Sequence, residues 1–335
     1  MKTISAAAFA LVLLCSAALH AEVQVETVLE GLDNPTSVVI QPETGHLFIA
    51  DSAAGRVIRV VDGKAEPVIT GFPLDVYGKG PMYNIGPLGL AFLDKDTLVV
   101  GDGSLPDGEE MLRVYTVPAA GAQAIPCDQM KFSFTLPPTD DIKGEGSFYA
   151  LAVTKDAIFA TSNGDDTKGW VARADINGDK VENFRRFIAT KEAVEVDAPV
   201  GIAISPRGEV VVGQMGEINV PGDSLLSFYE ASSGKLLLNL PTGLYDIDAV
   251  AYSPKGQLYA LDFAWMDTTA GGLFQLIAQR ADGKQTLKAE KIVALDKPTA
   301  MTFDKDGALY ITVFGTSAEG DTVKSGKLLK IAPGL

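Results

Sequence analysis

Carboxylates are the side chains best placed to do chemistry in this chain, because histidine and cysteine are nearly absent. The 335 residues include two histidines and two cysteines, and His20 and Cys15 fall in a leader-like first segment. His46 and Cys127 remain. This inventory excludes a three-histidine zinc site, an iron–sulfur cluster and a CxxCH haem attachment. Any metal must bind mainly through oxygen, which favours Ca²⁺ or another hard divalent cation.

One short acidic segment has the spacing of a metal loop. Residues 175–179 read DINGD, which is similar to the start of a calcium-binding loop. The downstream glutamate that completes such a loop is missing. Asn-Gly favours the positive φ angles of a tight hairpin turn, so the segment predicts a turn between two strands.

The elements that must position any site repeat along the chain. Six segments share an apolar run, a polar turn and a second apolar run, and 34 glycines supply many turns. The aligned positions are Thr36, Leu88, Tyr149, Val200, Asp248 and Thr299, with spacings of 52, 61, 51, 48 and 51 residues. A period near 50 built from strands is typical of a β-propeller. The sequence therefore predicts an all-β fold with six blades.

The two ends of the chain are expected to share the last blade. The sixth repeat ends at Ile331, one strand short of the others, and a surplus apolar segment, Val23–Leu29, precedes the first repeat. Pairing of this N-terminal strand with the sixth blade would close the ring and remove unpaired sheet edges. Residues 22–335 are thus expected to form one domain, and a closed ring is expected to be a monomer.

The first 21 residues have the pattern of a secretory signal peptide. Lys2 precedes the apolar run Ala6–Leu14, and small residues lead to Ala21, the expected cleavage site, with Ala18 as the alternative. We expect an extracytoplasmic protein, periplasmic or secreted, with no membrane anchor in the mature chain. Removal of the peptide changes the net charge from −15 to −16. So acidic a chain is a poor partner for nucleic acid.

Function is expected on the face that carries the long loops. The first-to-second strand turns are short, whereas the second-to-third connections are mostly long. Five of these loops and residues 140–145 hold 15 acidic and 3 basic side chains. This charge could attract Ca²⁺ or a cationic ligand, or simply solvate the loops. Candidate ligand-face residues are Tyr83, Asp102, Tyr149, Asn163, Trp170, Gln214, Asp262 and Trp265.

The repeats resemble a known superfamily. GLDNPTSVVIQPETGHLFIADSAAGRVIRV and APVGIAISPRGEVVVGQ are similar to NHL repeats and to six-bladed gluconolactonase (SMP-30) and strictosidine-synthase-like proteins. The lactonase branch holds a divalent metal with a Glu, an Asn and an Asp. Asp248 matches the Asp, and GEGSFY resembles the Glu motif but lies in the third repeat. The resemblance implies Glu145 and Asp248 as metal ligands and catalytic residues, whereas Thr36 and Val200 depart from its pattern.

Two functions remain open at this point. The first is a binding protein for a small molecule, a glycan or a protein at the acidic long-loop face. The second is a lactonase-like or other hydrolase-like enzyme that uses Ca²⁺ or another divalent cation at the channel mouth. A strictosidine-synthase-like activity would need a pocket carboxylate that no motif identifies. No haem, nucleotide or iron–sulfur cofactor is expected.

Overall fold

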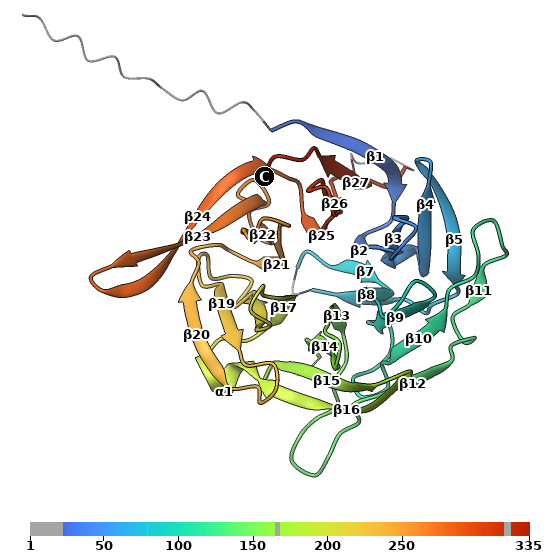
Figure 1. The fold of residues 1–335 in the computed structure, drawn as a ribbon, viewed down its shortest axis with the longest axis horizontal. Coiled ribbons are helices and arrows are strands. Elements are labelled where there is room, and N and C mark those ends of the chain that lie inside the picture. The colour runs from blue at the N-terminus through green and yellow to red at the C-terminus, as the bar shows by residue number, and fades with distance from the viewer. Residues whose placement is uncertain (1–22, 79, 165–167, 318–322) are drawn as a thin grey trace, which may run out of the picture.

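The structure is a computed structural model that describes residues 23–78, 80–164, 168–317 and 323–335. These residues form six β-sheets arranged as a ring around a central axis, and Figure 1 looks down that axis. The predicted all-β six-bladed propeller is confirmed. Every blade has its first strand innermost, so the aligned repeat positions all lie near the centre of the ring (Figure 1).

Five blades are built from strands that follow one another from the centre outward. Blades 1 and 2 contain β2 (Pro35–Ile40), β3 (Leu47–Asp51), β4 (Arg56–Val61) and β5 (Lys64–Thr70), then β8 (Pro87–Phe92), β9 (Thr97–Asp102), β10 (Leu112–Thr116) and β12 (Phe132–Phe134). Blades 3 to 5 contain β13 (Phe148–Val153), β14 (Ala157–Ser162), β15 (Trp170–Asn177) and β16 (Lys180–Ala189); β17 (Pro199–Ile204), β18 (Val210–Gln214), β19 (Leu225–Tyr229) and β20 (Leu236–Pro241); and β21 (Ile247–Tyr252), β22 (Leu258–Asp262), β23 (Gly272–Ala281) and β24 (Lys284–Ala294).

The sixth blade joins both ends of the chain. Its strands run outward as β25 (Pro298–Phe303), β26 (Leu309–Val313), β27 (Gly326–Ile331) and β1 (Val25–Leu32). The antiparallel pairing of β1 with β27 extends from Val25 opposite Ile331 to Leu32 opposite Gly326. The expected completion of the last blade by the N-terminal strand is confirmed, two to three residues further along the chain than predicted. This pairing closes the ring and covers the outer edge of β27, which would otherwise be unpaired.

Burial falls from the inner strands toward the outer ones, which explains the apolar runs of the repeat. The strands β3, β18 and β22 are buried at every residue, as strands covered on both faces must be. The outermost β20 alternates between half-buried and exposed side chains over most of its length. Continuous apolar runs therefore mark the inner half of each blade, and alternation marks its outer half.

The hydrophobic core is divided among the six interfaces between neighbouring blades. Between blades 1 and 2, for example, Phe48 and Ile69 pack in one cluster with Leu98 and Tyr115. Equivalent clusters fill the other interfaces, including the one between blade 6 and blade 1 that contains Ile49 and Leu328. Within the described residues each blade is therefore buried against its two neighbours around the ring.

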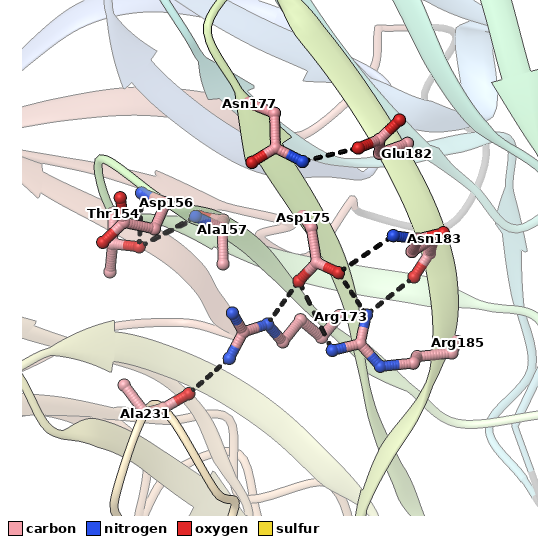
Figure 2. A network of polar contacts seen from close by, with 10 residues as sticks. All are labelled: Thr154, Asp156, Ala157, Arg173, Asp175, Asn177, Glu182, Asn183, Arg185 and Ala231. Carbon is pink, nitrogen blue, oxygen red and sulfur yellow. Dashed lines mark hydrogen bonds and ion pairs between the residues drawn. The ribbon is translucent and has the colours of Figure 1, made fainter.

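The DINGD segment forms the turn between β15 and β16, as predicted (Figure 2). Asp175 accepts hydrogen bonds from Arg173 at 3.0 Å and from Arg185 at 2.8 Å. Although burial acts to raise the pKa of Asp175, the bonds from Arg185 and Arg173 outweigh it, and that pKa lies below its usual value. The carboxylate is neutralised by two guanidinium groups and is not part of a calcium loop.

Other connections carry little regular structure. They include the strand β11 (Ile125–Pro126), which adds to blade 1 beside β5, and the helix α1 (Thr190–Val194). A search of the described residues finds no helix long and apolar enough to cross a membrane. The predicted signal peptide at residues 1–21 lies outside the described residues.

Candidate functional site

Two sets of equivalent repeat positions surround the channel mouth on the long-loop face. The first set is the second residue of each innermost strand, and it contributes Thr36, Leu88, Tyr149, Val200 and Asp248 to one cavity. The second set is the residue that directly follows each second strand, and it contributes Asn163, Met215, Phe263 and Phe314. Both positions lie where the strands of a blade reach the same face. The propeller therefore brings together side chains that are up to 278 residues apart, from Thr36 to Phe314.

A small hairpin covers this cavity. It lies in the connection between blades 1 and 2 and consists of β6 (Asp75–Tyr77) and β7 (Tyr83–Ile85). Tyr77, Tyr83 and Ile85 all line the cavity beneath it. Three hydrogen bonds tie it to the surrounding loops: Trp265 Nε1–H to the Pro81 carbonyl at 3.2 Å, Asn163 Nδ2–H to Tyr77 Oη at 2.7 Å, and Asn34 Nδ2–H to the Asn84 carbonyl at 3.0 Å.

The covered cavity is small. Water-sized molecules have about 40 Å³ in which to move, enough for a few waters, since one water needs roughly 10–15 Å³ by that measure. Its walls are mainly aromatic and aliphatic, with Asp248 as the one carboxylate and no Lys, Arg or His among the described lining residues. A ligand of any size must therefore displace the hairpin, and its chemistry should be apolar with few polar groups.

The buried Asp248 and the half-buried Tyr149 form a hydrogen-bonded pair at the inner end of the cavity. The Tyr149 hydroxyl donates a hydrogen bond of 2.5 Å to Asp248 Oδ2, and Asp248 is 3% exposed. Burial raises the pKa of Asp248 well above its usual value, and the nearby Asp246 and Asp262 add to the effect. Burial and the Asp248 carboxyl also raise the pKa of Tyr149. Both shifts favour the protonated forms, although the bond from Tyr149 opposes the rise for Asp248, and a protonated Asp248 can act as a hydrogen-bond donor.

A second, wider cavity reaches the same pair from below. It follows the inner strands along the central axis, offers water-sized molecules about 380 Å³ and is lined as far as Val39, Val153 and Phe303 near the short turns. It shares three lining residues with the mouth cavity: Thr36, Tyr149 and Asp248. The Tyr149–Asp248 pair thus lies between an apolar mouth and a channel roomy enough for water.

Several predicted ligand-face residues instead hold the loops in place. Asp102 forms a buried ion pair of 2.5 Å with Arg113. Asp262 accepts hydrogen bonds from the backbone N–H groups of Tyr245, Asp246 and Ala264 at 2.8–3.1 Å. The Gln214 side chain donates to the Val196 carbonyl and accepts from the Ser227 hydroxyl. These three residues end second strands, so they fix the start of each long loop. None lines the mouth cavity.

Trp170 and Glu145 also lie outside the cavity lining. Trp170 begins β15, is 9% exposed and stacks near Lys168, whose Nζ is 5.9 Å from the ring centroid. Glu145 is fully buried and accepts a hydrogen bond of 2.8 Å from Ser162 Oγ. Of the eight predicted ligand-face residues, Tyr83, Tyr149, Asn163 and Trp265 do line the cavity, together with the predicted catalytic residue Asp248.

Burial also reduces the acidic charge that the loop sequences suggest. Eleven of the 15 acidic side chains counted there lie in the described residues, and four of these are buried: Asp102, Glu110, Glu145 and Asp262. The sequence count is therefore an overestimate of the charge that a ligand would meet at this face, because paired or protonated carboxyls contribute little field to solvent.

The described donor set does not fit the divalent metal that the lactonase resemblance implies. No group of three or more His, Cys, Asp or Glu side chains in the described residues is arranged to hold an ion. Asp248 is occupied by the Tyr149 hydroxyl and Glu145 by the Ser162 hydroxyl. The Thr36 hydroxyl donates to the Pro87 and Leu88 carbonyls. A metal shared by Glu145 and Asp248 stays a prediction without support from this arrangement.

Comparison with solved structures places the fold, whereas two sequence comparisons find no relative. No protein-family model matches the chain, and no curated protein matches its sequence. Among solved structures, a Thermus thermophilus protein described as an oxidoreductase (glucose dehydrogenase) has a TM-score of 0.63 at 18% identity and covers 92% of this chain and 100% of its own. These values show a shared propeller fold.

Two further neighbours name different chemistries on the same fold. A gluconolactonase from Xanthomonas campestris has a TM-score of 0.56 at 15% identity, with 94% of this chain and 92% of that one covered. A Streptomyces coelicolor aldose sugar dehydrogenase in its PQQ-bound form has a TM-score of 0.58 at 12% identity, with 93% and 99% covered. PQQ is a polyanion, and a cavity without described cationic side chains does not suit it. The fold is compatible with a lactonase-like enzyme or with ligand binding.

Sequence reasoning missed several residues of the cavity. Met215 and Phe314 were not selected as ligand-face residues, although they stand at the repeat position already represented by Asn163. Aligning the repeats on the end of the second strand, and not only on the start of the first, would have found them. The cover over the cavity had no such signal, because the β6–β7 hairpin is not part of the repeat.

Proposed function

We propose that the protein is a lactonase-like hydrolase that acts on a small uncharged ester or lactone at the channel mouth, with Asp248 as the general acid and Tyr149 as its positioning residue. The observation that carries the proposal is the hydrogen-bonded Tyr149–Asp248 pair. Asp248 is the one carboxylic acid among the described residues of the cavity lining. The gluconolactonase-like propellers among the structural neighbours support the reaction class.

The geometry suits activation of a carbonyl group. Tyr149 donates to Asp248 Oδ2, so the carboxyl proton resides on Oδ1, from which it can be donated to a carbonyl oxygen of the substrate. As water from the channel attacks the carbonyl carbon, Asp248 gives its proton to the carbonyl oxygen and takes the proton that the water releases. When the tetrahedral intermediate collapses, Asp248 gives its proton to the leaving oxygen, the ester C–O bond breaks, and the hydroxyl of the reforming carbonyl returns a proton to Asp248. No step in this sequence is routed through a metal.

The residues that line the mouth cavity indicate which substrate charge the site accepts. An anionic substrate would meet no described Lys, Arg or His in the cavity and would lie beside acidic loops. Burying a charge without a partner costs far more than burying a neutral ester. The site therefore favours uncharged substrates, whereas the hydroxy acid that is formed carries a charge and is expelled.

The second candidate is binding without turnover. The aromatic lining, with Tyr83, Phe263, Trp265 and Phe314 in mutual contact, resembles a ligand pocket whether or not chemistry follows. A glycan or a protein docking on the long loops belongs to this candidate. In both cases we propose a monomer exported across a membrane, in keeping with the signal-peptide pattern of residues 1–21.

A panel of lactones and aryl esters decides between the two candidates. We expect turnover of at least one uncharged substrate, unaffected by EDTA. Asp248→Asn should lower kcat/KM by about 10²–10⁴, the range for loss of a general acid. Tyr149→Phe should lower kcat more than it raises KM, because it frees the carboxyl to rotate. The matched control is Asp306→Asn, a change at an exposed turn far from the mouth. Absence of turnover across the panel, or full activity of Asp248→Asn, would overturn the hydrolase.

A further inference from the structure

Tyr83 of the covering hairpin fills an aromatic cup at the channel mouth. The cup, defined here as Phe263, Trp265 and Phe314, surrounds the Tyr83 ring with centroid distances of 5.8, 5.2 and 5.3 Å. The interplanar angles of 81°, 76° and 63° make all three contacts edge-to-face. Such contacts are specific to rings, since the positive edge of one meets the negative face of another.

The cup is held by its own blades and not by Tyr83. The Phe263 N–H donates to the Asp246 carbonyl at 2.9 Å, and the Trp265 N–H donates to Asp246 Oδ2 at 2.5 Å. The Phe314 N–H donates to the Lys297 carbonyl at 2.9 Å. Phe263 also contacts both other rings, with centroids 4.9 Å from Trp265 and 5.6 Å from Phe314. These bonds belong to blades 5 and 6 and fix the backbone of the cup without Tyr83, whereas the Trp265 indole N–H also donates to the Pro81 carbonyl of the hairpin at 3.2 Å.

The hairpin, in contrast, lies outside the six blades, and the three hydrogen bonds given above would have to break for it to move. Its two strands have three residues each and pair with one another outside the six blades. An isolated two-stranded sheet is marginal in water. Its outer side leaves Leu74, Val76 and Met82 between 49% and 55% exposed. Of the two partners in the ring contact, the hairpin is therefore the one that can move.

We propose that the aromatic cup is a subsite for a planar ring of the ligand, and that Tyr83 occupies this subsite as a built-in substitute until a ligand displaces it. This inference deepens the proposed function, on which it rests for the reacting group. The cup and the Tyr149–Asp248 pair line the same cavity. A ring seated in the cup would thus carry an attached ester toward Asp248, which identifies the substrate class as phenyl-type esters or ring-bearing lactones.

The chain provides its own optical reporter for this subsite. It has two tryptophans, Trp170 and Trp265. Trp265 is part of the cup, whereas Trp170 lies outside the cavity lining. In a Trp170→Phe background the emission of Trp265 therefore reports on what fills the cup. The Trp265→Phe variant, which retains Trp170, is the matched control and should give no saturable response.

The experiment titrates these proteins with p-cresol, which reproduces the tyrosine side chain, and with 4-methylcyclohexanol, which has a similar size but no aromatic ring. We expect a saturable change in Trp265 emission with p-cresol and at least 10-fold weaker binding of the cyclohexanol. Tyr83→Ala removes the competing ring and should tighten p-cresol binding at least 10-fold. Tyr310→Ala, which removes a tyrosine ring on a blade 6 strand, should leave the affinity unchanged.

Each outcome bears on the subsite separately from catalysis. Equal binding of the two alcohols to the Trp170→Phe protein would overturn the ring subsite, and this comparison needs no hairpin variant. Failure of a folded Tyr83→Ala protein to bind p-cresol more tightly would overturn the role of Tyr83. Should that variant not fold, Tyr83→Leu keeps the apolar volume and is expected to give the same tightening. Ring binding without any ester turnover would refute the hydrolase and leave the subsite intact.

Discussion

Glu110 should destabilise the folded protein at neutral pH, and replacing it with glutamine should stabilise the chain. The side chain is 2% exposed and accepts the Ser147 N–H at 2.6 Å. Burial raises its pKa to about 9, and repulsion from Asp102, Asp107 and Asp75 adds to burial against the opposing effect of the Ser147 bond. A glutamine keeps the acceptor oxygen for Ser147 and has no charge to bury.

The expected size follows from the two pKa values. At pH 7 the unfolded chain has lost this proton, since the usual value is 4.5, whereas the folded protein retains it. Each pH unit above the unfolded value costs the folded state about 1.4 kcal/mol until the folded pKa is reached. The gain in free energy of unfolding for Glu110→Gln should therefore be about 3.5 kcal/mol at most at pH 7. It should vanish below pH 4.5 and level off above pH 9.

Urea denaturation at pH 4, 7 and 9 measures this difference. Glu109→Gln is the matched control, because the neighbouring glutamate is exposed and its substitution should change the free energy of unfolding by less than about 0.5 kcal/mol at every pH. A Glu110→Gln protein that is less stable than the wild type at pH 7, or a difference that is the same at pH 4 and pH 9, would refute the reasoning. Either result would mean that Glu110 is ionised and compensated in the folded state.

Three further predictions follow from the same structure. In the proposed mechanism Asp248 acts in its protonated form, so kcat/KM for an uncharged ester should be flat at low pH and fall as pH rises through the raised pKa of Asp248. A pH–rate profile that rises there instead would contradict the assignment. Saturating Ca²⁺ or EDTA should leave the melting temperature unchanged, because a metal bound to the folded state would raise it. Deleting Val25–Leu32 should expose the edge of β27 and cause aggregation or strand exchange in light scattering, whereas a monomer of unchanged stability would show that ring closure does not depend on β1.

The repeat made the fold predictable from the sequence. Each repeat carries the same local signal, which is an apolar run, a turn and a second apolar run. Six copies of this signal identify the strands more reliably than one copy would. The same periodicity predicted the strand that completes blade 6, since Ile331 left one strand missing. The strand bounds shifted by two to three residues because β1 continues to Leu32, where it meets Gly326.

The sequence predicted those site residues that lie at equivalent positions of the repeat, but it did not predict which side chains contact one another. Asp248 and Tyr149 were found because they occupy the aligned position of each innermost strand, yet nothing in the sequence shows that the two side chains meet, 99 residues apart. Asp102 and Asp262 were chosen for their charge at a loop start. Their burial and their partners, Arg113 and three backbone N–H groups, depend on tertiary contacts that a single sequence does not reveal.

The parts of the site that break the repeat are the ones that determine what can bind. The repeat alone would leave an open mouth surrounded by equivalent positions. Thr36 and Asp248, for example, are each the second residue of an innermost strand. The β6–β7 hairpin occurs once, between blades 1 and 2, and places Tyr83 against rings from blades 5 and 6. Because it crosses the opening, the hairpin couples access to Asp248 with occupancy of the cup. Selectivity for a ring and exclusion of bulk water then have the same structural origin.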